Sequence, residues 1–195
     1  MGKRELNKQL IKERLLKVAL ELFATKGFEQ TTVADIVDAA EIGRGTFYNY
    51  FPDVKAIFSA VIEDMNVQLQ ELTDEAKKEG TNLYELLYIS FKTYFDFVSG
   101  QKTIKAFHLK NFEYIRSNSY SSDTLKQVVS DLRKDLKARK AISDFKEDYE
   151  FQLLSMMLVG SPVELFLAFL KSDVKISNDE MAAFLAKLFR KVLKN

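Results

Sequence analysis

An all-α fold of two domains is predicted for this chain of 195 residues by three observations. Apolar residues recur at the three- and four-residue spacing of helices over nearly the whole sequence. No segment alternates apolar and polar residues as a half-buried strand does. Only two prolines and seven glycines interrupt the pattern, and 47% of the residues are hydrophobic, which is typical of a globular protein with a substantial core.

Composition excludes several classes of site. The chain has no cysteine, so disulfides and thiolate metal sites are ruled out. His108 is the only histidine, and we expect neither a metal nor a cofactor. No apolar run approaches the roughly 20 residues that span a bilayer, and the basic N-terminus lacks the apolar stretch of a signal peptide. These features predict a cytoplasmic protein with no membrane partner.

The first helix carries one apolar stripe with helical spacing, made of Leu15, Val18, Ala19, Leu22 and Phe23. Lys26 followed by Gly27 is typical of a helix C-terminus, where glycine adopts a left-handed conformation. Residues 1–30 hold seven Lys and Arg against four Glu, an excess of three positive charges. This excess is compatible with contacts to phosphates and equally with a solvated helix face.

A second helix begins at Thr32, with Asp35 three residues on as the partner of a capping box. Its predicted buried face consists of Val33, Ile36, Val37 and Ala40. A third, short helix runs from about Gly43 to Tyr50 after a four-residue turn. The segment 51–53, Phe-Pro-Asp, ends it, and its last residue is placed to cap a fourth helix.

The fourth helix is long, because apolar residues keep helical phase from Val54 to Leu72 and the segment closes only at Gly80. We place a domain boundary within this helix, which predicts one domain of residues 1–60 and a second of residues 61–195. The second domain is expected to be helical throughout, with helices near 82–98, 102–118, 122–140, 146–171 and 177–194.

Two short helices joined by a tight turn form the helix-turn-helix arrangement, whose second helix presents its first residues to base edges in the major groove of DNA. Arg44 is suited to a bidentate contact with guanine. Gly45 costs helix stability but lets the backbone approach a groove wall closely. The other residues predicted here to contact DNA are Thr32, Thr46, Tyr48 and Asn49, and those predicted to pack inward are Phe47, Tyr50 and Phe51.

Residues 7–58 resemble the DNA-binding domain of the TetR family of bacterial transcriptional repressors. The matching strings are Leu-Glu-Leu-Phe-Ala-Thr-Lys-Gly-Phe at 20–28, Thr-Thr-Val-Ala-Asp-Ile at 31–36 and Arg-Gly-Thr-Phe-Tyr-Asn-Tyr-Phe at 44–51. The resemblance implies a homodimer that binds a palindromic operator in double-stranded DNA. It also implies a C-terminal domain that releases DNA when a small effector, apolar or amphipathic, fills it.

Three positions depart from the family pattern. Glu41 stands where the turn usually has glycine, so the turn must tolerate a side chain there. Gly43 replaces a serine-like cap and offers no side-chain oxygen. Val54 stands where a phosphate-binding lysine is usual, and the resemblance suggests that the adjacent Lys55 takes over the contact with DNA.

Aromatic residues are dense between positions 84 and 114. Most of them are expected to form packed core, and some to line an apolar cavity with tyrosine hydroxyls and His108 as polar handles. His108 is also compatible with a hydrogen-bonded place in the core. The predicted pocket residues are Tyr84, Tyr88, Phe91, Phe95, His108, Phe112 and Met156.

The segment from Met156 to Leu170 is too apolar all round for a helix with one solvent face, which favours burial against a second subunit. Pro162 is expected to kink or restart this helix. The predicted dimer contacts are Met157, Leu165, Phe169, Phe184 and Leu188. A monomer with a buried core helix is the alternative.

The basic run 133–140 is compatible with nucleic-acid contact, with a solvated face, or with attraction of an anionic ligand such as an acyl thioester. A rival function is an enzyme that uses His108 with carboxylates, but no nucleophile–base spacing, phosphate loop or metal cluster supports it. A second rival is a helical adaptor for a protein partner. The sequence therefore predicts a ligand-responsive DNA-binding regulator, a repressor rather than an enzyme.

Overall fold

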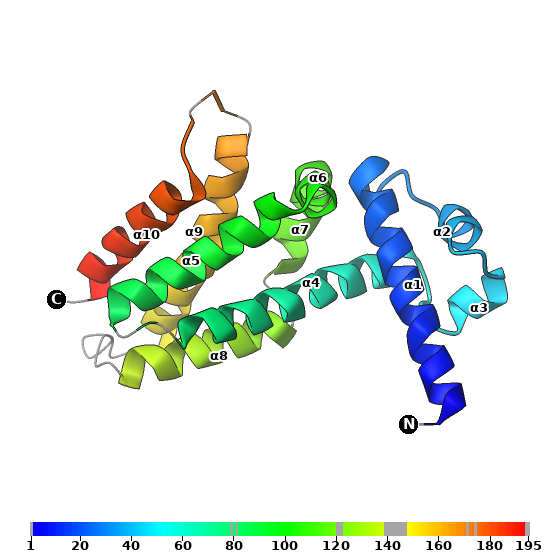
Figure 1. The fold of residues 1–195 in the computed structure, drawn as a ribbon, viewed down its shortest axis with the longest axis horizontal. Helices are drawn as coiled ribbons and strands as arrows, with labels where there is room; N and C mark the ends of the chain where they lie inside the picture. Colours follow the sequence, from blue (N-terminus) through cyan, green and yellow to red (C-terminus); the bar gives the residue numbers. More distant parts are fainter. Residues whose placement is uncertain are drawn as a thin grey trace. The chain divides into compact units, whose positions relative to one another are not determined.

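The computed structural model describes residues 2–78, 80, 82–119, 123–138, 148–170, 172–173 and 175–193, and within them the chain is all-α, as predicted. Figure 1 shows the order of the helices along the chain. Their bounds are α1 (Lys3–Thr25), α2 (Val33–Ala39), α3 (Arg44–Tyr48), α4 (Val54–Lys77), α5 (Leu83–Gly100), α6 (Lys102–Lys110), α7 (Phe112–Ser119), α8 (Asp123–Ala138), α9 (Asp148–Leu170) and α10 (Asn178–Leu193).

The helices form two compact units. The first consists of Met1–Asn66 with Gly100–Ser122, and the second of Val67–Ser99 with Asp123–Asn195. The long helix α4 contributes its first half to one unit and its second half to the other. The first unit therefore contains α6 and α7 as well as the N-terminal helices. The functional division at residue 60 stays a prediction, since compactness does not say which residues bind DNA.

A cluster of aromatic rings joins four helices of the first unit. Phe58 of α4 lies at its centre, with ring centroids 5.0 Å from Phe23, 4.8 Å from Phe28 and 5.4 Å from Phe107. Tyr114 of α7 packs on Phe28 at 4.3 Å. Aromatic pairs at these separations stabilise beyond the area that they bury. The cluster thus holds α6 and α7 against α1 and α4.

The predicted single helix over 102–118 is wrong, because it breaks into α6 and α7 at Asn111. The Asn111 side chain donates hydrogen bonds to the carbonyl oxygens of Phe23 and Phe107, each at 2.8 Å, and accepts one from the Phe28 amide at 2.7 Å. Asn111 is only 2% exposed. Its amide therefore satisfies backbone groups at the end of α1, a contact that helical periodicity cannot reveal.

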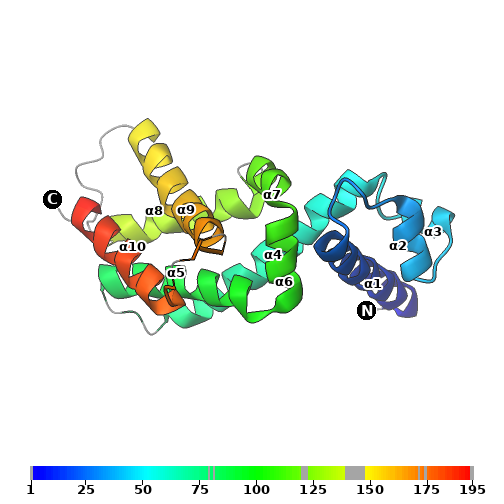
Figure 2. The same cartoon turned by 90° about the horizontal axis from the view of Figure 1, so that it is seen from above.

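The second unit is built from α5, the second half of α4 and α8 to α10. In both views α9 and α10 lie side by side next to α5 (Figures 1 and 2). Phe95 of α5 stacks on Phe166 of α9 at 5.9 Å, and Phe91 packs against Phe189 of α10 at 5.9 Å. Apolar side chains of α5 thus pack against both C-terminal helices.

Helix α9 departs from expectation in two ways. It continues without a restart across Pro162, although a proline there withholds one hydrogen bond from the helix. Contrary to the expectation that no apolar run is so long, residues 149–170 form a helix long and apolar enough to cross a membrane, the one such helix in the described part of the chain. Only 33% of that window is buried, and the other residues of the window are half-buried or exposed.

Candidate functional site

The start of α2 is fixed by the predicted capping box. The Thr32 hydroxyl accepts a hydrogen bond from the Asp35 amide at 3.2 Å, and the Thr32 amide donates to the Asp35 carboxylate at 2.9 Å. Lys26, at the end of α1, forms an ion pair with the same carboxylate. These bonds, that from Lys26 foremost, lower the pKa of Asp35 to about 2. The cap therefore ties α1 to α2.

The turn between α2 and α3 is a Schellman motif with glutamate at its left-handed position. The Ile42 amide bonds to the Val37 carbonyl oxygen at 3.0 Å, and the Glu41 amide to that of Asp38 at 3.2 Å. Glu41 has φ 53°, which is left-handed like the φ of 86° at Gly27 after α1. The turn thus accepts a side chain where glycine is usual, at a cost in backbone strain.

Helix α3 is a five-residue helix whose inner side anchors it to the unit. Phe47 is fully buried and Phe51 nearly so, whereas Tyr50 is half-buried. Gly43 is the N-cap of α3. It makes no side-chain hydrogen bond, because glycine has no side chain. The inward side of α3 is therefore as predicted, and it fixes which residues face outward.

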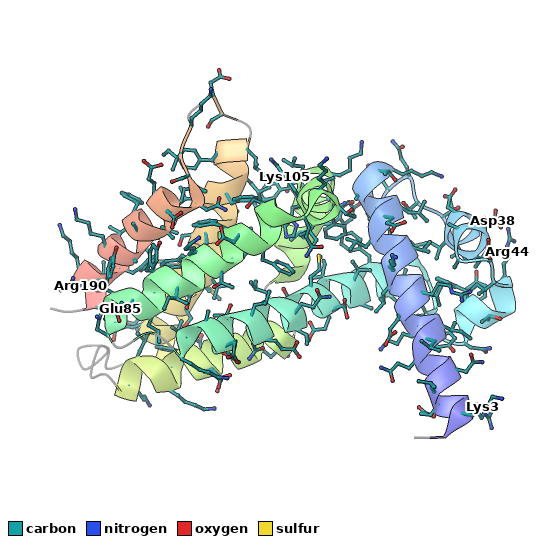
Figure 3. The ribbon with its side chains drawn as sticks, viewed as in Figure 1. Lys3, Asp38, Arg44, Glu85, Lys105 and Arg190 are labelled. Atoms are coloured by element: carbon teal, nitrogen blue, oxygen red, sulfur yellow. The ribbon has the colours of Figure 1, made fainter. Side chains whose placement is uncertain are left out.

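The predicted DNA-contacting residues lie on the outside of this unit. Arg44, Gly45, Tyr48 and Asn49 are exposed, and Thr46 is half-buried. Figure 3 shows Arg44 at the outer edge of α3, away from α1. Arg44 makes no ion pair or hydrogen bond with any residue that the structure describes. The guanidinium is thus available to an external partner.

Gly45 is not required by packing within the protein. A Cβ built on this residue meets no atom within 4 Å. Its φ is not in the left-handed region, so the backbone does not need glycine either. A glycine in a helix costs about 0.5–1 kcal/mol relative to alanine. Neither packing nor backbone conformation thus requires glycine at this position.

Two further helix ends border this surface. The Asp53 carboxylate accepts a hydrogen bond from the Ala56 amide at 2.7 Å and so caps α4, as predicted. Lys55 in the first turn of α4 is exposed, whereas Val54 is half-buried. Thr32, at the start of α2, is exposed as well. Lys55 and Thr32 are thus placed on helix N-termini, where anions bind favourably.

The first turns of α1 extend past the packed unit. Every residue from Gly2 to Leu10 is exposed, and the first buried residue of the helix is Leu15. Arg4, Lys8 and Lys12 follow one another at four-residue spacing, so they continue the helix face that Leu15 presents to the core. Lys3 lies at the free end of this helix (Figure 3). The basic excess is therefore exposed and lies mainly beyond the core.

The predicted pocket residues are divided between the two units. Tyr84, Tyr88, Phe91 and Phe95 lie on α5 and Met156 on α9, in the second unit, whereas His108 and Phe112 belong to the first. Phe91 and Phe95 pack between helices, as described above. Tyr88 donates a hydrogen bond to Asp179 at 2.6 Å, and Met156 is 52% exposed. The assignment of these residues to a pocket stays a prediction.

His108 of α6 is buried and hydrogen-bonded. Its Nδ1 donates to the Ile104 carbonyl oxygen at 2.8 Å, because a carbonyl oxygen can only accept. Burial lowers the pKa of the imidazole and outweighs the opposite effect of this hydrogen bond. No group of three or more metal-ligating side chains occurs among the described residues.

Three of the five predicted dimer residues are exposed on the single chain. Met157 and Phe184 are each 61% exposed and Leu188 is 46% exposed, whereas Leu165 and Phe169 are half-buried. Other large apolar side chains are exposed beside them on the same two helices, namely Leu153, Met156 and Val192. Apolar surface thus gathers along α9 and α10.

Comparison with known proteins identifies the unit that carries α3. Residues 15–61 match the model of the family described as bacterial regulatory proteins, tetR family. This segment, which contains α2 and α3, is thus similar to the TetR family of bacterial regulatory proteins. The HTH-type transcriptional regulator YdgC of Bacillus subtilis is 26% identical to the chain over 170 residues, which is 84% of this chain and 83% of YdgC.

Two solved structures share the fold of this chain. The fatty acid degradation regulator FadR from Bacillus halodurans has a TM-score of 0.71 and 17% identity, covering 91% of this chain and 93% of that one. The transcriptional regulator FadR from Bacillus subtilis, solved in complex with stearoyl-CoA, has a TM-score of 0.70 and 22% identity, covering 91% and 96%. The likeness extends over both units.

Two residues that matter to this architecture escaped the sequence analysis. Asn111 links α6 to the end of α1, and only its interruption of an otherwise apolar face hinted at a special place. Tyr94 was one of many aromatic residues on α5, yet its hydroxyl is buried without a hydrogen-bond partner among the described residues. No sequence pattern distinguishes such a hydroxyl from a satisfied one.

Proposed function

We propose that this protein is a homodimeric repressor of the TetR family that reads a palindromic operator with α3 and leaves it when an apolar or amphipathic effector binds. The observation that carries the proposal is the outward face of α3, where Arg44 and Gly45 stand exposed on a helix anchored by Phe47. In this proposal residues 1–60 bind DNA in the cytoplasm, and residues 61–195 bind the effector and the second subunit.

Base recognition is assigned to the first residues of α3. Arg44 contacts guanine, Gly45 admits the groove wall, and Thr46 meets a thymine methyl group or a phosphate. Tyr48 and Asn49 contact phosphate or sugar. A good bidentate contact contributes about 1–3 kcal/mol of discrimination between bases. Sequence preference should thus depend on Arg44 more than on any other side chain.

Phosphate contacts surround this reading surface. Thr32 and Lys55 lie at the N-termini of α2 and α4, where the helix dipole favours an anion. Arg4, Lys8 and Lys12 extend the contact along α1 beyond the packed unit. Such contacts raise affinity without sequence preference, and salt weakens them. They hold α3 in its groove.

Dimerisation is assigned to the exposed apolar surface of α9 and α10. Met157, Phe184 and Leu188 are largely exposed on the single chain, and only one third of the apolar window in α9 is buried. A second copy packed on this surface by twofold symmetry would bury it. The two α3 helices would then reach half-sites separated by about 34–36 Å or a multiple of that distance.

The effector is proposed to bind in the second unit and to contain a long acyl chain. The shared fold with a FadR solved in complex with stearoyl-CoA supports this class of ligand. Helix α4 continues from the DNA-binding unit into the second unit, and Asn111 joins α6 to α1. Binding would shift the population toward dimers whose α3 helices no longer fit the operator, with a coupling of about 1–3 kcal/mol.

Selection of DNA sites from a random duplex pool tests the proposal. The full-length protein should enrich inverted repeats whose half-site centres are about 10 base pairs, or a multiple, apart. Sedimentation should give two subunits per selected site. Enrichment of no sequence, or of a single half-site bound by one subunit, would contradict the palindromic homodimer.

Charged substitutions test the dimer surface separately. Phe184→Glu or Leu165→Glu should lower the sedimentation mass toward that of one chain and weaken binding to the palindrome. Glu in place of the exposed Val67 on α4 is the control, since it lies outside α9 and α10. An unchanged mass for both charged variants would refute this surface as the interface.

A further inference from the structure

Two hydroxyl groups in the second unit are buried without partners. The Tyr94 hydroxyl of α5 and the Ser161 hydroxyl of α9 make no hydrogen bond with any described residue. Leaving such a group unsatisfied costs about 1–3 kcal/mol, and most buried hydroxyls in proteins are paired. Ser155 of α9 illustrates the usual case, since its hydroxyl donates to the Phe151 carbonyl oxygen at 2.8 Å. The two unpaired groups therefore call for an explanation.

The ring of Tyr94 is surrounded by apolar side chains. Its ring packs edge-on against Phe166 at 6.3 Å and against Phe95 at 5.6 Å, and these two phenylalanines stack on each other. Helical spacing places Tyr94 on the buried face of α5, between the buried residues Leu87 and Val98. Tyr94 as a whole is half-buried, although its hydroxyl has no exposed surface.

The electrostatics of the hydroxyl restrict what it can bind. Burial raises the pKa of Tyr94 far above its ordinary value, and the negative charge of Glu164 adds to this effect. The group is therefore a neutral phenol and a hydrogen-bond donor. A carboxylate beside it would leave water and meet the repulsion of Glu164, whereas a neutral carbonyl oxygen would not.

We propose that the Tyr94 hydroxyl donates a hydrogen bond to the neutral carbonyl of an acyl thioester, whose chain lies beside the Tyr94 ring. This assignment rests on the proposed effector-binding function of the second unit. It deepens that function by naming the polar handle and by selecting thioesters over free fatty acids. The bound carbonyl gives the hydroxyl its missing partner. The free-energy penalty of the unpaired hydroxyl in the free protein is thereby relieved, which adds to the affinity for the ligand.

Calorimetric titration of the full-length protein with stearoyl-CoA and with stearate tests the assignment. Stearoyl-CoA should bind the wild type more tightly than stearate. Tyr94→Phe should weaken stearoyl-CoA binding about tenfold. Tyr114→Phe is the matched control, because it removes a hydroxyl that is bonded to Glu29 in the first unit. The affinity of Tyr114→Phe for stearoyl-CoA should equal that of the wild type.

Thermal unfolding without ligand provides the second readout. Tyr94→Phe should leave Tm unchanged or raise it, since the hydroxyl contributes no bond, whereas Ser155→Ala should lower it. A fall in Tm for Tyr94→Phe as large as that for Ser155→Ala would show an internal partner and overturn the proposal. Unchanged stearoyl-CoA affinity in Tyr94→Phe would overturn it too.

Two further outcomes separate this proposal from the function on which it rests. Equal affinity of the wild type for stearate and stearoyl-CoA would refute the selection of a neutral carbonyl. No binding of stearoyl-CoA to the wild type would refute the acyl thioester altogether. Enrichment of a palindrome in the DNA selection would stand in either case, because that experiment contains no effector.

Discussion

Substitution of Gly45 by alanine should stabilise the protein and weaken its binding to DNA at the same time. The added Cβ meets no atom within 4 Å, and the backbone is not in the left-handed region. Alanine in place of glycine within a helix contributes about 0.5–1 kcal/mol of stability. For a chain of this length that gain corresponds to a rise in Tm of roughly 1–4 °C.

The effect on DNA follows from the outward position of the same residue. Gly45 is exposed beside Arg44, so a methyl group there points into any surface that α3 approaches closely. Forcing one extra carbon into a packed contact costs about 1–3 kcal/mol, or roughly 5- to 150-fold in affinity. The free protein should gain stability and the complex should lose it.

Thermal unfolding and a gel-shift titration with the selected operator measure the two effects. Gly100→Ala is the matched control, because its Cβ also meets no atom within 4 Å and it lies at the end of α5, not in α3. Its operator affinity should equal that of the wild type. If Gly45→Ala bound the operator as tightly as the wild type, the close approach of α3 to the groove would be refuted.

Three other substitutions test the supports of the reading surface. Glu41→Gly should relieve the left-handed strain and raise stability by about 1 kcal/mol in urea unfolding; a loss of stability would contradict the strain argument. Asn111→Ala removes two buried hydrogen bonds and one part-buried one, and should cost about 2–3 kcal/mol. Asn178→Ala, whose bonds to Asp96 and Ser99 lie nearer the surface, should cost under about 1 kcal/mol; equal costs would refute the structural role of Asn111. Because the pKa of Asp35 is lowered to about 2 from an ordinary 3.8, its carboxylate stabilises the fold above about pH 4 and stops doing so as the pH falls toward 2. The urea midpoint of the wild type should therefore exceed that of Asp35→Asn at pH 6, and the difference should shrink as the pH falls from 4 to 2; a constant difference would contradict the ion pair and cap.

The reading unit was predictable because its signals are local. Thr32 and Asp35 form a capping box that needs only a three-residue spacing, and Asp53 caps α4 by the same logic. Gly27 marks the end of α1 through its own backbone preference. The inward side of α3 follows from the spacing of its aromatic residues. Each of these features depends on neighbours within one or two helical turns.

What the sequence could not reveal depends on distant partners. Asn111 interrupts a helical pattern because its amide bonds to backbone groups more than 80 residues away. Pro162 predicted a kink or a restart of α9, and the helix continues across it without a restart. Whether a tyrosine such as Tyr94 finds a partner for its hydroxyl depends on the packing of another helix. Periodicity describes one helix at a time and misses such contacts.

The ratio of operator affinity to affinity for a scrambled duplex, measured for Arg44→Ala against the wild type, tests the central claim most directly. Loss of the guanine contact should lower operator affinity by about 1–3 kcal/mol while binding to the scrambled duplex changes much less. Lys8→Gln provides the contrast, since a lost phosphate contact should weaken both duplexes alike and reduce the salt dependence by about one counterion. The ratio should therefore fall for Arg44→Ala and stay constant for Lys8→Gln. An unchanged ratio for Arg44→Ala would mean that α3 does not read the operator through this residue.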